Sequence, residues 1–206
     1  MDSHERFKLV LGSASPRRKE LLKKTFLNFE IKSADIDEKS VETIPEKFVV
    51  DIANQKAQAV WDLLNNQNAI VIGADTIVTC DNVILEKPTN INHARQMLYS
   101  LSGRSHDVLT GVSLISKYAQ RSFFSLTKVY FNYLDEDLIE KYLETKDSLD
   151  KAGGYGIQSD AMIFVDKIEG SYSNVVGLPV DKVYDELANM IRHFDSSIKD
   201  WRSVIE

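Results

Sequence analysis

Apolar and polar positions along the chain form two kinds of pattern that together indicate an α/β protein. Short apolar or alternating runs predict strands, and apolar residues at every third or fourth position predict helices. Strands are predicted over residues 7–12, 69–73, 76–80, 83–85, 106–116, 122–133 and 161–168, and helices over 17–26, 45–64, 92–101, 135–144 and 179–194. Loops are predicted over 146–157 and 170–177. Without a repeat or a break in composition, we expect one domain over residues 1–206, with later strands pairing partly antiparallel.

The helix predicted over 17–26 follows the first strand through a tight turn. We expect Ser15 to cap this helix and Pro16 to occupy its first position, where no backbone N–H is needed. Leu21 and Leu22 should face the core. The helix over 45–64 has an apolar face made of Val49, Ile52, Ala53, Ala57, Val60, Leu63 and Leu64.

Charge and cysteine content narrow the classes of function. The 206 residues contain 25 Lys and Arg against 31 Asp and Glu, which gives a formal charge of −6. This acidic charge argues against strong nucleic-acid binding, and any site for an anion must be a small cluster of cations. Cys80 is the single cysteine, so no intramolecular disulfide is formed and a reducing compartment is expected. Residues 1–7 lack the apolar core of a signal peptide, and no apolar run is long enough to span a bilayer. We therefore expect a cytoplasmic protein without membrane contact.

Three cations stand at the start of the helix over 17–26, where the helix dipole is already positive. Arg17, Arg18 and Lys19 are unfavourable there unless an anion lies beside them, and Ser13 offers a hydroxyl donor close by. The spacing of a P-loop is absent. A phosphate site and a solvated basic face are equally compatible with this pattern.

Lys56 and Asp75 are two further candidates. Lys56 falls near the middle of an apolar helix face, where an ammonium must be paired, line a site or extend past its neighbours to water. Asp75 follows the apolar run 69–73, so we place it at the carboxyl end of a strand, where open α/β sheets bind ligands. It either accepts a proton or holds a metal, or it caps a turn.

Later segments carry weaker signals. Lys87 precedes a proline beyond a hairpin, and its position alone favours an exposed loop residue over a phosphate contact. Residues 150–158 form a glycine-rich loop in which Gln158 offers the donor and the acceptor that a base edge requires, although such loops also occur in ordinary turns. The four histidines, at 4, 93, 106 and 193, have no metal-ligand spacing, and Cys80 is better explained as a small strand residue than as a nucleophile.

Taken together, these stretches resemble the Maf family of nucleoside triphosphate pyrophosphatases. The resemblance is carried, in collinear order, by LVLGSASPRRKELL, NQKAQAV, IVIGADTIV, LEKP, LSGRSHDVLTGV, DKAGGYGIQ and GSYSNVVGLP. It implies an inosine-triphosphatase-like (Maf/Ham1) α/β fold, an elongated mixed sheet flanked by helices with a cleft between two lobes. It also implies hydrolysis of a nucleoside triphosphate to the monophosphate and pyrophosphate with a divalent metal, Mg or Mn.

The resemblance assigns roles to individual residues. Asp75 would be the general base, and Glu38 would help to hold the metal. Substrate contacts are expected from Ser13, Arg17, Arg18, Lys56 and Lys87. The expected partner is the nucleotide substrate, and a homodimer is left open.

The family divides by substrate, and Arg17, Thr76 and Gln158 match the subgroup that resembles dTTP and UTP pyrophosphatases. Ser159 and Asp160 depart from the family pattern, which usually has a glycine-containing turn there, and Gly154 replaces a common alanine. Two alternatives to a dTTP/UTP pyrophosphatase are an enzyme mainly for modified nucleotides and a non-catalytic regulator of septum formation.

Overall fold

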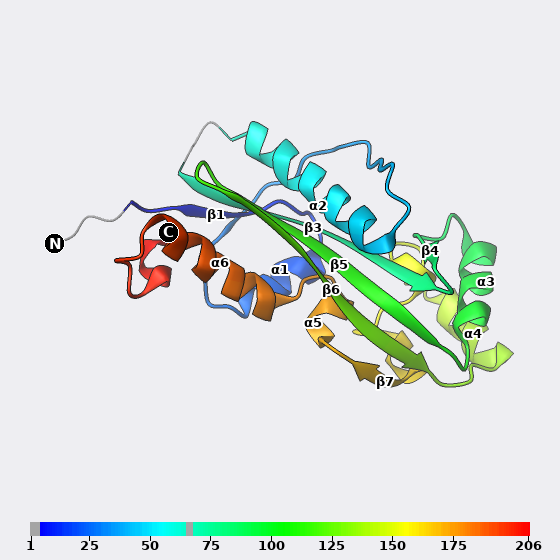
Figure 1. The fold of residues 1–206 in the computed structure, drawn as a ribbon. Coiled ribbons are helices and arrows are strands. Elements are labelled where there is room, and N and C mark those ends of the chain that lie inside the picture. The colour runs from blue at the N-terminus through cyan, green and yellow to red at the C-terminus, as the bar shows by residue number, and fades with distance from the viewer. Residues whose placement is uncertain (1–4, 65–67) are drawn as a thin grey trace. The chain divides into compact units, whose positions relative to one another are not determined.

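The computed structural model describes residues 5–64 and 68–206 (Figure 1). His4 and the rest of residues 1–4 lie outside this description. The described residues form two compact units. Unit 1 draws on the described residues up to Asp75, on Gly111–Phe124 and on Gly177–Glu206, and unit 2 on Thr76–Thr110 and Ser125–Val176.

Seven strands form one mixed sheet within the described residues. They are β1 (Lys8–Leu11), β2 (Glu30–Ile31), β3 (Ala69–Cys80), β4 (Val83–Leu85), β5 (Ser105–Ile115), β6 (Gln120–Phe131) and β7 (Val165–Glu169). The order is β2-β1-β3-β5-β6-β7, with β4 paired to β3. β1 is parallel to β2 and β3, whereas β4 is antiparallel to β3 and β7 antiparallel to β6. The predicted α/β class with a partly antiparallel sheet is confirmed.

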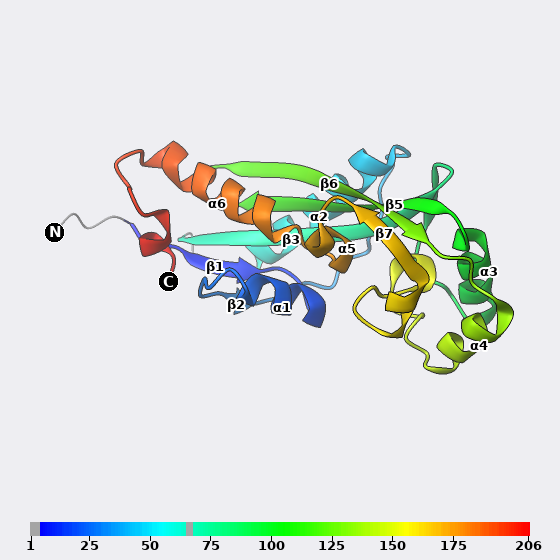
Figure 2. The ribbon, with the colours of Figure 1, turned by 90° about the horizontal axis from the view of Figure 1, so that it is seen from below.

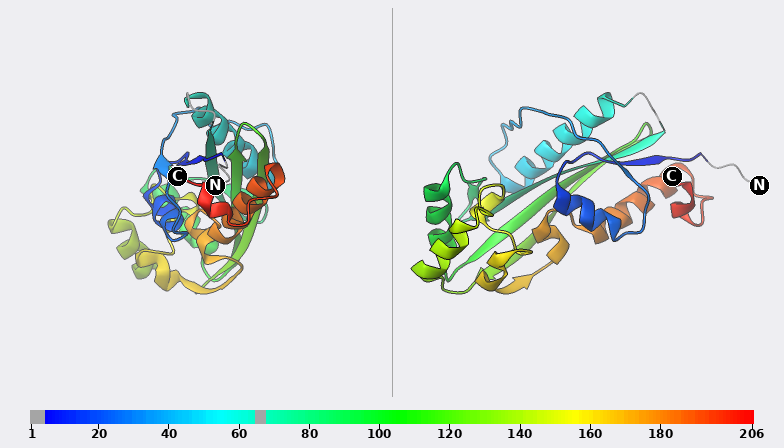
Figure 3. Two further views of the ribbon diagram at one scale, coloured as in Figure 1. Left: turned by 90° about the vertical axis from the view of Figure 1, so that its left-hand side faces the viewer. Right: turned by 180° about the vertical axis from the view of Figure 1, so that it is seen from behind.

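Unit 1 has helices on both faces of its strands. Figure 3 shows α2 (Pro45–Asp62) on one side of β1, and α1 (Pro16–Lys23) with α6 (Val180–Phe194) on the other; Figure 2 shows the same arrangement from below. Leu21 and Leu22 of α1 are buried, as predicted. Most of the predicted apolar face of α2 is buried as well, from Val49 to Val60.

The close contact of α2 with the strands depends on two glycines. A Cβ atom on Gly73 of β3 would lie 2.5 Å from the carbonyl oxygen of Ala53 and 2.6 Å from the amide nitrogen of Ala57. A Cβ atom on Gly111 of β5 would overlap the carbonyl oxygen of Val49. Because glycine has no Cβ, the backbone of α2 can rest directly on these two strands.

Unit 2 contains α3 (Ile91–Leu101), α4 (Glu136–Glu144) and α5 (Tyr172–Val176). α3 and α4 lie side by side in Figure 1 and contact each other. Asn90 and Asp135 cap α3 and α4, since each side chain accepts a hydrogen bond from a first-turn N–H. The core of this unit contains the aromatic rings of Phe131, Tyr155 and Phe164.

Two sequence predictions about strands were wrong. β3 does not end near Gly73 but continues through Asp75 to Cys80, since Gly73 serves the contact with α2 and does not break the strand. The strand predicted over 161–168 begins only at Val165, because residues 160–164 form a 3₁₀ turn in which the Met162 N–H bonds to the Ser159 carbonyl.

Helical boundaries also differ from the prediction. α1 ends at Lys23 because Phe26 adopts a left-handed conformation with a φ of 59°, which an α-helix cannot contain. Leu63 is exposed beyond the end of α2 instead of facing the core. The loop expected over 170–177 contains α5, and neither β2 nor the 3₁₀ turn Trp201–Val204 was predicted. Within the described residues, no helix is both long and apolar enough to cross a membrane.

Candidate active site

The N-terminus of α1 is built as the sequence predicts. Ser15 caps the helix, because its Oγ accepts a hydrogen bond from the N–H of Arg18 at 3.4 Å, and Pro16 occupies the first position. No acidic residue lies in the first turn. The positive end of the helix dipole and the adjacent cations therefore have the same sign, which favours an anion at this point.

Arg18 is held in place from two directions within unit 1. Its Nε donates to the carbonyl oxygen of Gly177 at 2.8 Å, and its Nη1 donates to the Oγ of Ser13 at 3.2 Å. Ser13 itself is buried, and its Oγ also accepts from the N–H of Ser15 at 3.2 Å. The guanidinium is thus fixed beside the start of α1 before any ligand is bound.

Charges around Arg18 act on its pKa in both directions. Burial lowers the pKa of the Arg18 guanidinium, the carboxylate of Asp75 opposes this, the cation of Arg17 lowers it further, and Glu38 opposes it. The net direction is downward. An anion bound here would oppose the effects of burial and of Arg17.

Lys56 bridges two carboxylates. Its Nζ lies 2.7 Å from the Oδ1 of Asp75 and 2.8 Å from the Oε2 of Glu38. The side chains of Lys56 and Asp75 are only 16% and 13% exposed, whereas that of Glu38 is 49% exposed. Lys56 is therefore paired with carboxylates, and its ammonium does not extend past its neighbours to water.

The position of Lys56 follows from the packing of α2. Ala53 and Ala57, which flank Lys56 in α2, contact β3 at Gly73. Gly73 lies two residues before Asp75. Because the helix backbone lies so close to the strand, the Lys56 side chain reaches the Asp75 carboxylate directly. A larger side chain at residue 73 would push α2 away and lengthen this ion pair.

Asp75 lies within β3 and not at its carboxyl end, so the predicted position at a strand end is wrong. The strand end that lies nearby is that of β1. Pairing of β1 with β3 stops at Leu11 and Ile72, and Gly12 then donates its N–H to the Ile72 carbonyl at 2.8 Å. Asp75 therefore follows the segment of β3 that β1 covers, in the same unit as the start of α1.

Three predicted residues belong to unit 2. The Oγ1 of Thr76 lies 3.0 Å from the Oγ1 of Thr110, which in turn donates to the carbonyl oxygen of Asn174 at 3.0 Å. Lys87 and Gln158 are both exposed. The structure thus brings Ser13, Arg18, Lys56, Asp75 and Glu38 together within unit 1, with Arg17 in the same helix turn.

The comparison with known proteins decides the family. Residues 8–190 match the family model described as Maf-like protein. The chain belongs to the Maf family. The resemblance stated from the sequence motifs is therefore confirmed over most of the chain.

Two relatives of this Maf family member are similar along nearly their whole length. A protein of Bacillus mycoides (strain KBAB4) named dTTP/UTP pyrophosphatase is 45% identical over 192 residues, which cover 93% of this chain and 97% of the relative. One of Alkaliphilus oremlandii (strain OhILAs) with the same name is 47% identical over 193 residues, covering 92% and 98%. Among solved structures, the Staphylococcus aureus Ham1 protein matches with a TM-score of 0.53 at 10% identity, covering 89% of this chain and 99% of that one. This last similarity confirms the predicted fold.

Sequence reasoning missed several groups that support the candidate residues of this Maf protein. The carbonyl oxygen of Gly177 holds Arg18 in place, and the buried hydroxyl of Thr110, itself bonded to the carbonyl oxygen of Asn174, holds Thr76. Nothing in the spacing of these residues sets them apart from ordinary loop and strand residues. Cys80 is buried in β3 and burial raises the pKa of its thiol, which agrees with a small strand residue.

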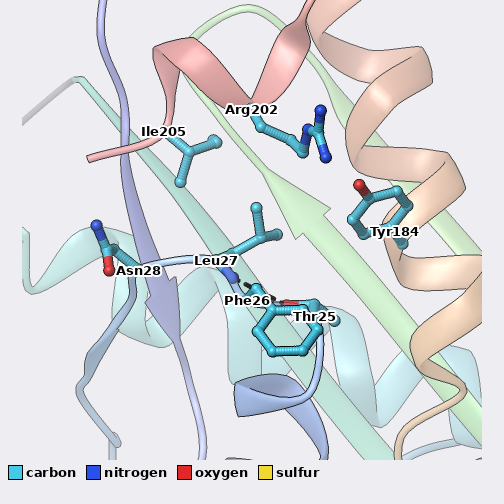
Figure 4. A pocket seen from close by; sticks show the side chains of 7 residues that line it. All are labelled: Thr25, Phe26, Leu27, Asn28, Tyr184, Arg202 and Ile205. Carbon is cyan, nitrogen blue, oxygen red and sulfur yellow. Dashed lines mark hydrogen bonds between the residues drawn. The ribbon is translucent and has the colours of Figure 1, made fainter.

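A pocket of about 230 Å³ lies elsewhere in unit 1 (Figure 4). It is lined by residues 25–28, Tyr184, Arg202 and Ile205. None of the predicted site residues lines it. Arg202 is already paired with Asp200 at 2.9 Å, so the pocket offers no uncompensated cation from this residue.

Proposed function

We propose that this protein hydrolyses dTTP and UTP to the nucleoside monophosphate and pyrophosphate. The observation that carries the proposal is the bridge from Lys56 to Asp75 and Glu38, in the same unit as the cations that begin α1. The names of the two relatives support this choice of substrate.

The chemistry suits this set of charges. A triphosphate carries up to about four negative charges, and phosphoryl transfer is catalysed chiefly by positioning and by charge stabilisation. Arg17, Arg18 and Lys56 would supply the positive charge from unit 1. Lys56 has three N–H donors, and the two carboxylates use two of them. The third would donate to a phosphate oxygen.

Asp75 would act as the general base. In the proposed step a water oxygen forms a bond to the α-phosphorus, and the bond from that phosphorus to the oxygen bridging to the β-phosphorus breaks. The carboxylate of Asp75 takes the proton of the water, and pyrophosphate leaves with the bridging oxygen. The ion pair with Lys56 orients the Asp75 carboxylate for this role.

A divalent metal is part of the proposal, and the residues present fit one. Within the described residues, no group of three His, Cys, Asp or Glu side chains is arranged to hold a metal ion by itself. Glu38 and Asp75 nevertheless offer two carboxylates, and Mg²⁺ is usually held by one or two carboxylates together with substrate phosphates and water. When bound, the ion would neutralise charge on the phosphate oxygens.

Substrate choice is assigned in this proposal to Arg17, Thr76 and Gln158, with Lys87 as a further phosphate contact. Gln158 has both a donor and an acceptor, which pair with the polar edge of uracil or thymine. The single cysteine supports a cytoplasmic site of action.

A screen of pyrophosphate release from dTTP, UTP, ATP, GTP and base-modified triphosphates tests the proposal. We expect release from dTTP and UTP to exceed that from ATP and GTP. Higher kcat/KM values for modified than for unmodified pyrimidine nucleotides would replace the proposed substrate by a modified one. Release from none of them would favour a non-catalytic regulator and contradict the proposal.

A further inference from the structure

Three side chains of unit 2 form a hydrogen-bonded network that includes one residue of the turn that carries Gln158. The N–H of Ser159 donates to the carbonyl oxygen of Gly156 at 3.0 Å, which makes residues 156–159 a tight turn with Gln158 as its third residue. The side chains of Asp147, Lys151 and Ser159, the last residue of this turn, are bonded to one another, and we call these three residues the clamp. Gln158 itself is exposed.

Lys151 is the centre of the clamp. Lys151 is only 9% exposed. Its Nζ donates to the carbonyl oxygen of Asp147 at 2.7 Å, to the Oδ1 of Asp147 at 2.6 Å and to the Oδ1 of Asp150 at 2.7 Å. These bonds use all three donors of the ammonium. A buried lysine with every donor satisfied is costly to displace, so this side chain is a rigid support.

Ser159 connects the turn to this support. Its Oγ lies 2.5 Å from the Oδ2 of Asp147 and 2.8 Å from the carbonyl oxygen of Gly156. A hydroxyl has one proton, and the Gly156 carbonyl already accepts from the Ser159 N–H, so the proton is donated to the charged carboxylate. Burial raises the pKa of Asp147, but the hydrogen bonds from Lys151 and Ser159 outweigh it and the net direction is downward.

The turn also rests on the stem of Lys151. A Cβ atom on Gly156 would lie 2.6 Å from the Cε of Lys151 and 3.1 Å from the Oγ of Ser159. The backbone on one side of Gln158 is thus packed against Lys151, and on the other side it is bonded through Ser159 to Asp147. Both flanks of Gln158 are held while its side chain points outward.

We propose that the clamp positions Gln158 for recognition of the pyrimidine base, with Ser159 as the positioning residue. This inference rests on the proposed function. The bond from Ser159 to Asp147 tethers the turn to the clamp. Its loss would let the turn adopt other conformations and weaken the binding of Gln158 to the base more than the chemical step.

The test compares kcat/KM for UTP and for GTP in the wild type, Ser159→Ala, Ser159→Thr and a matched control, Asp160→Asn. The ratio of the two values does not depend on the fraction of active enzyme, so a merely destabilised variant leaves it unchanged. We expect Ser159→Ala to lower the ratio about fivefold, chiefly through a higher KM for UTP, since a lost hydrogen bond of this kind weakens binding by about that factor. Ser159→Thr keeps the hydroxyl and should restore the ratio, and Asp160→Asn should retain it.

Hydrogen–deuterium exchange gives a second readout that needs no activity. The Ser159 amide should exchange faster in Ser159→Ala than in the wild type and Ser159→Thr. An unchanged ratio in Ser159→Ala, or an equal loss in Ser159→Thr, would overturn the role of the clamp while leaving the pyrophosphatase assignment intact. A wild type that releases no pyrophosphate, or that treats UTP and GTP alike, would overturn the proposed function and with it this inference.

Discussion

The ammonium of Lys56 lies 2.7 Å from the Oδ1 of Asp75, and both side chains are largely buried. A helix supplies the cation and a strand supplies the carboxylate, and they meet because Gly73 lets the two backbones touch. The packing of α2 on β3 thus places two charged groups of the candidate site in contact. A lysine on the apolar face of a helix would otherwise be an expensive feature.

Replacing Lys56 with Met tests whether this lysine serves the reaction or the fold. Met keeps the apolar stem and removes the charge. If Lys56 binds phosphate and orients Asp75, we expect kcat/KM for dTTP to fall about tenfold or more, while thermal unfolding shows a folded protein. A more stable variant with unchanged kinetics would show that Lys56 has no part in catalysis, because apolar replacement of a buried ion pair can itself be stabilising.

Gln158→Ala tests the assignment of base choice. In the wild type we expect kcat/KM for dTTP and UTP to exceed that for ATP and GTP about tenfold or more. Removing the Gln158 amide should narrow the gap mainly by slowing the pyrimidine reactions, since the base then loses its partner. Parallel measurements on the four nucleotides decide the matter. If the ratio of kcat/KM between pyrimidine and purine nucleotides is unchanged in Gln158→Ala, this residue does not recognise the base.

His106 should make stability depend on pH. Burial lowers its pKa from 6.5 to about 4, and its Nε2 lies 2.7 Å from the hydroxyl of Tyr155. Because the folded state resists protonation, the unfolded state binds a proton first as the pH falls from about 6.5 to about 4, and the free energy of unfolding should drop by about 3 kcal/mol across that range.

His106→Gln provides the comparison, since Gln places an amide near the Tyr155 hydroxyl but does not titrate. Urea unfolding at pH 7 and at pH 5 should show a smaller loss of stability in this variant than in the wild type. Equal losses in the two proteins would show that other groups cause the dependence on pH.

Prediction from the sequence succeeded where the local pattern and the tertiary contacts agree. The cap at Ser15, the proline at position 16 and the buried face of α2 from Val49 to Val60 are all local features, and each was predicted correctly. The end of β3 was not, because Gly73 is an ordinary strand breaker in the sequence but a contact point for α2 in the fold.

In the candidate site, too, features of the local sequence were predicted and those that depend on tertiary contacts were not. Single residues such as Lys56 and Asp75 stood out because each is out of place in its apolar surroundings. Other groups of the site did not stand out from their pattern. Gly177 offers Arg18 a carbonyl oxygen, which no side-chain pattern reports, and Glu38, which only the family resemblance named, lies in an irregular segment without periodicity. The tether from Ser159 to Asp147 joins two loop positions whose contact depends on the path of the chain between them.

Asp75→Asn, assayed by pyrophosphate release from dTTP with a binding measurement alongside, tests whether Asp75 is the base of the reaction. The substitution keeps the shape of the side chain and removes the base, and Asp62→Asn at the exposed end of α2 is the matched control. We expect kcat to fall about 10²- to 10⁴-fold in Asp75→Asn while dTTP still binds and the control keeps full activity. A kcat within about threefold of the wild type would contradict the role of Asp75 as the base and with it the proposed mechanism.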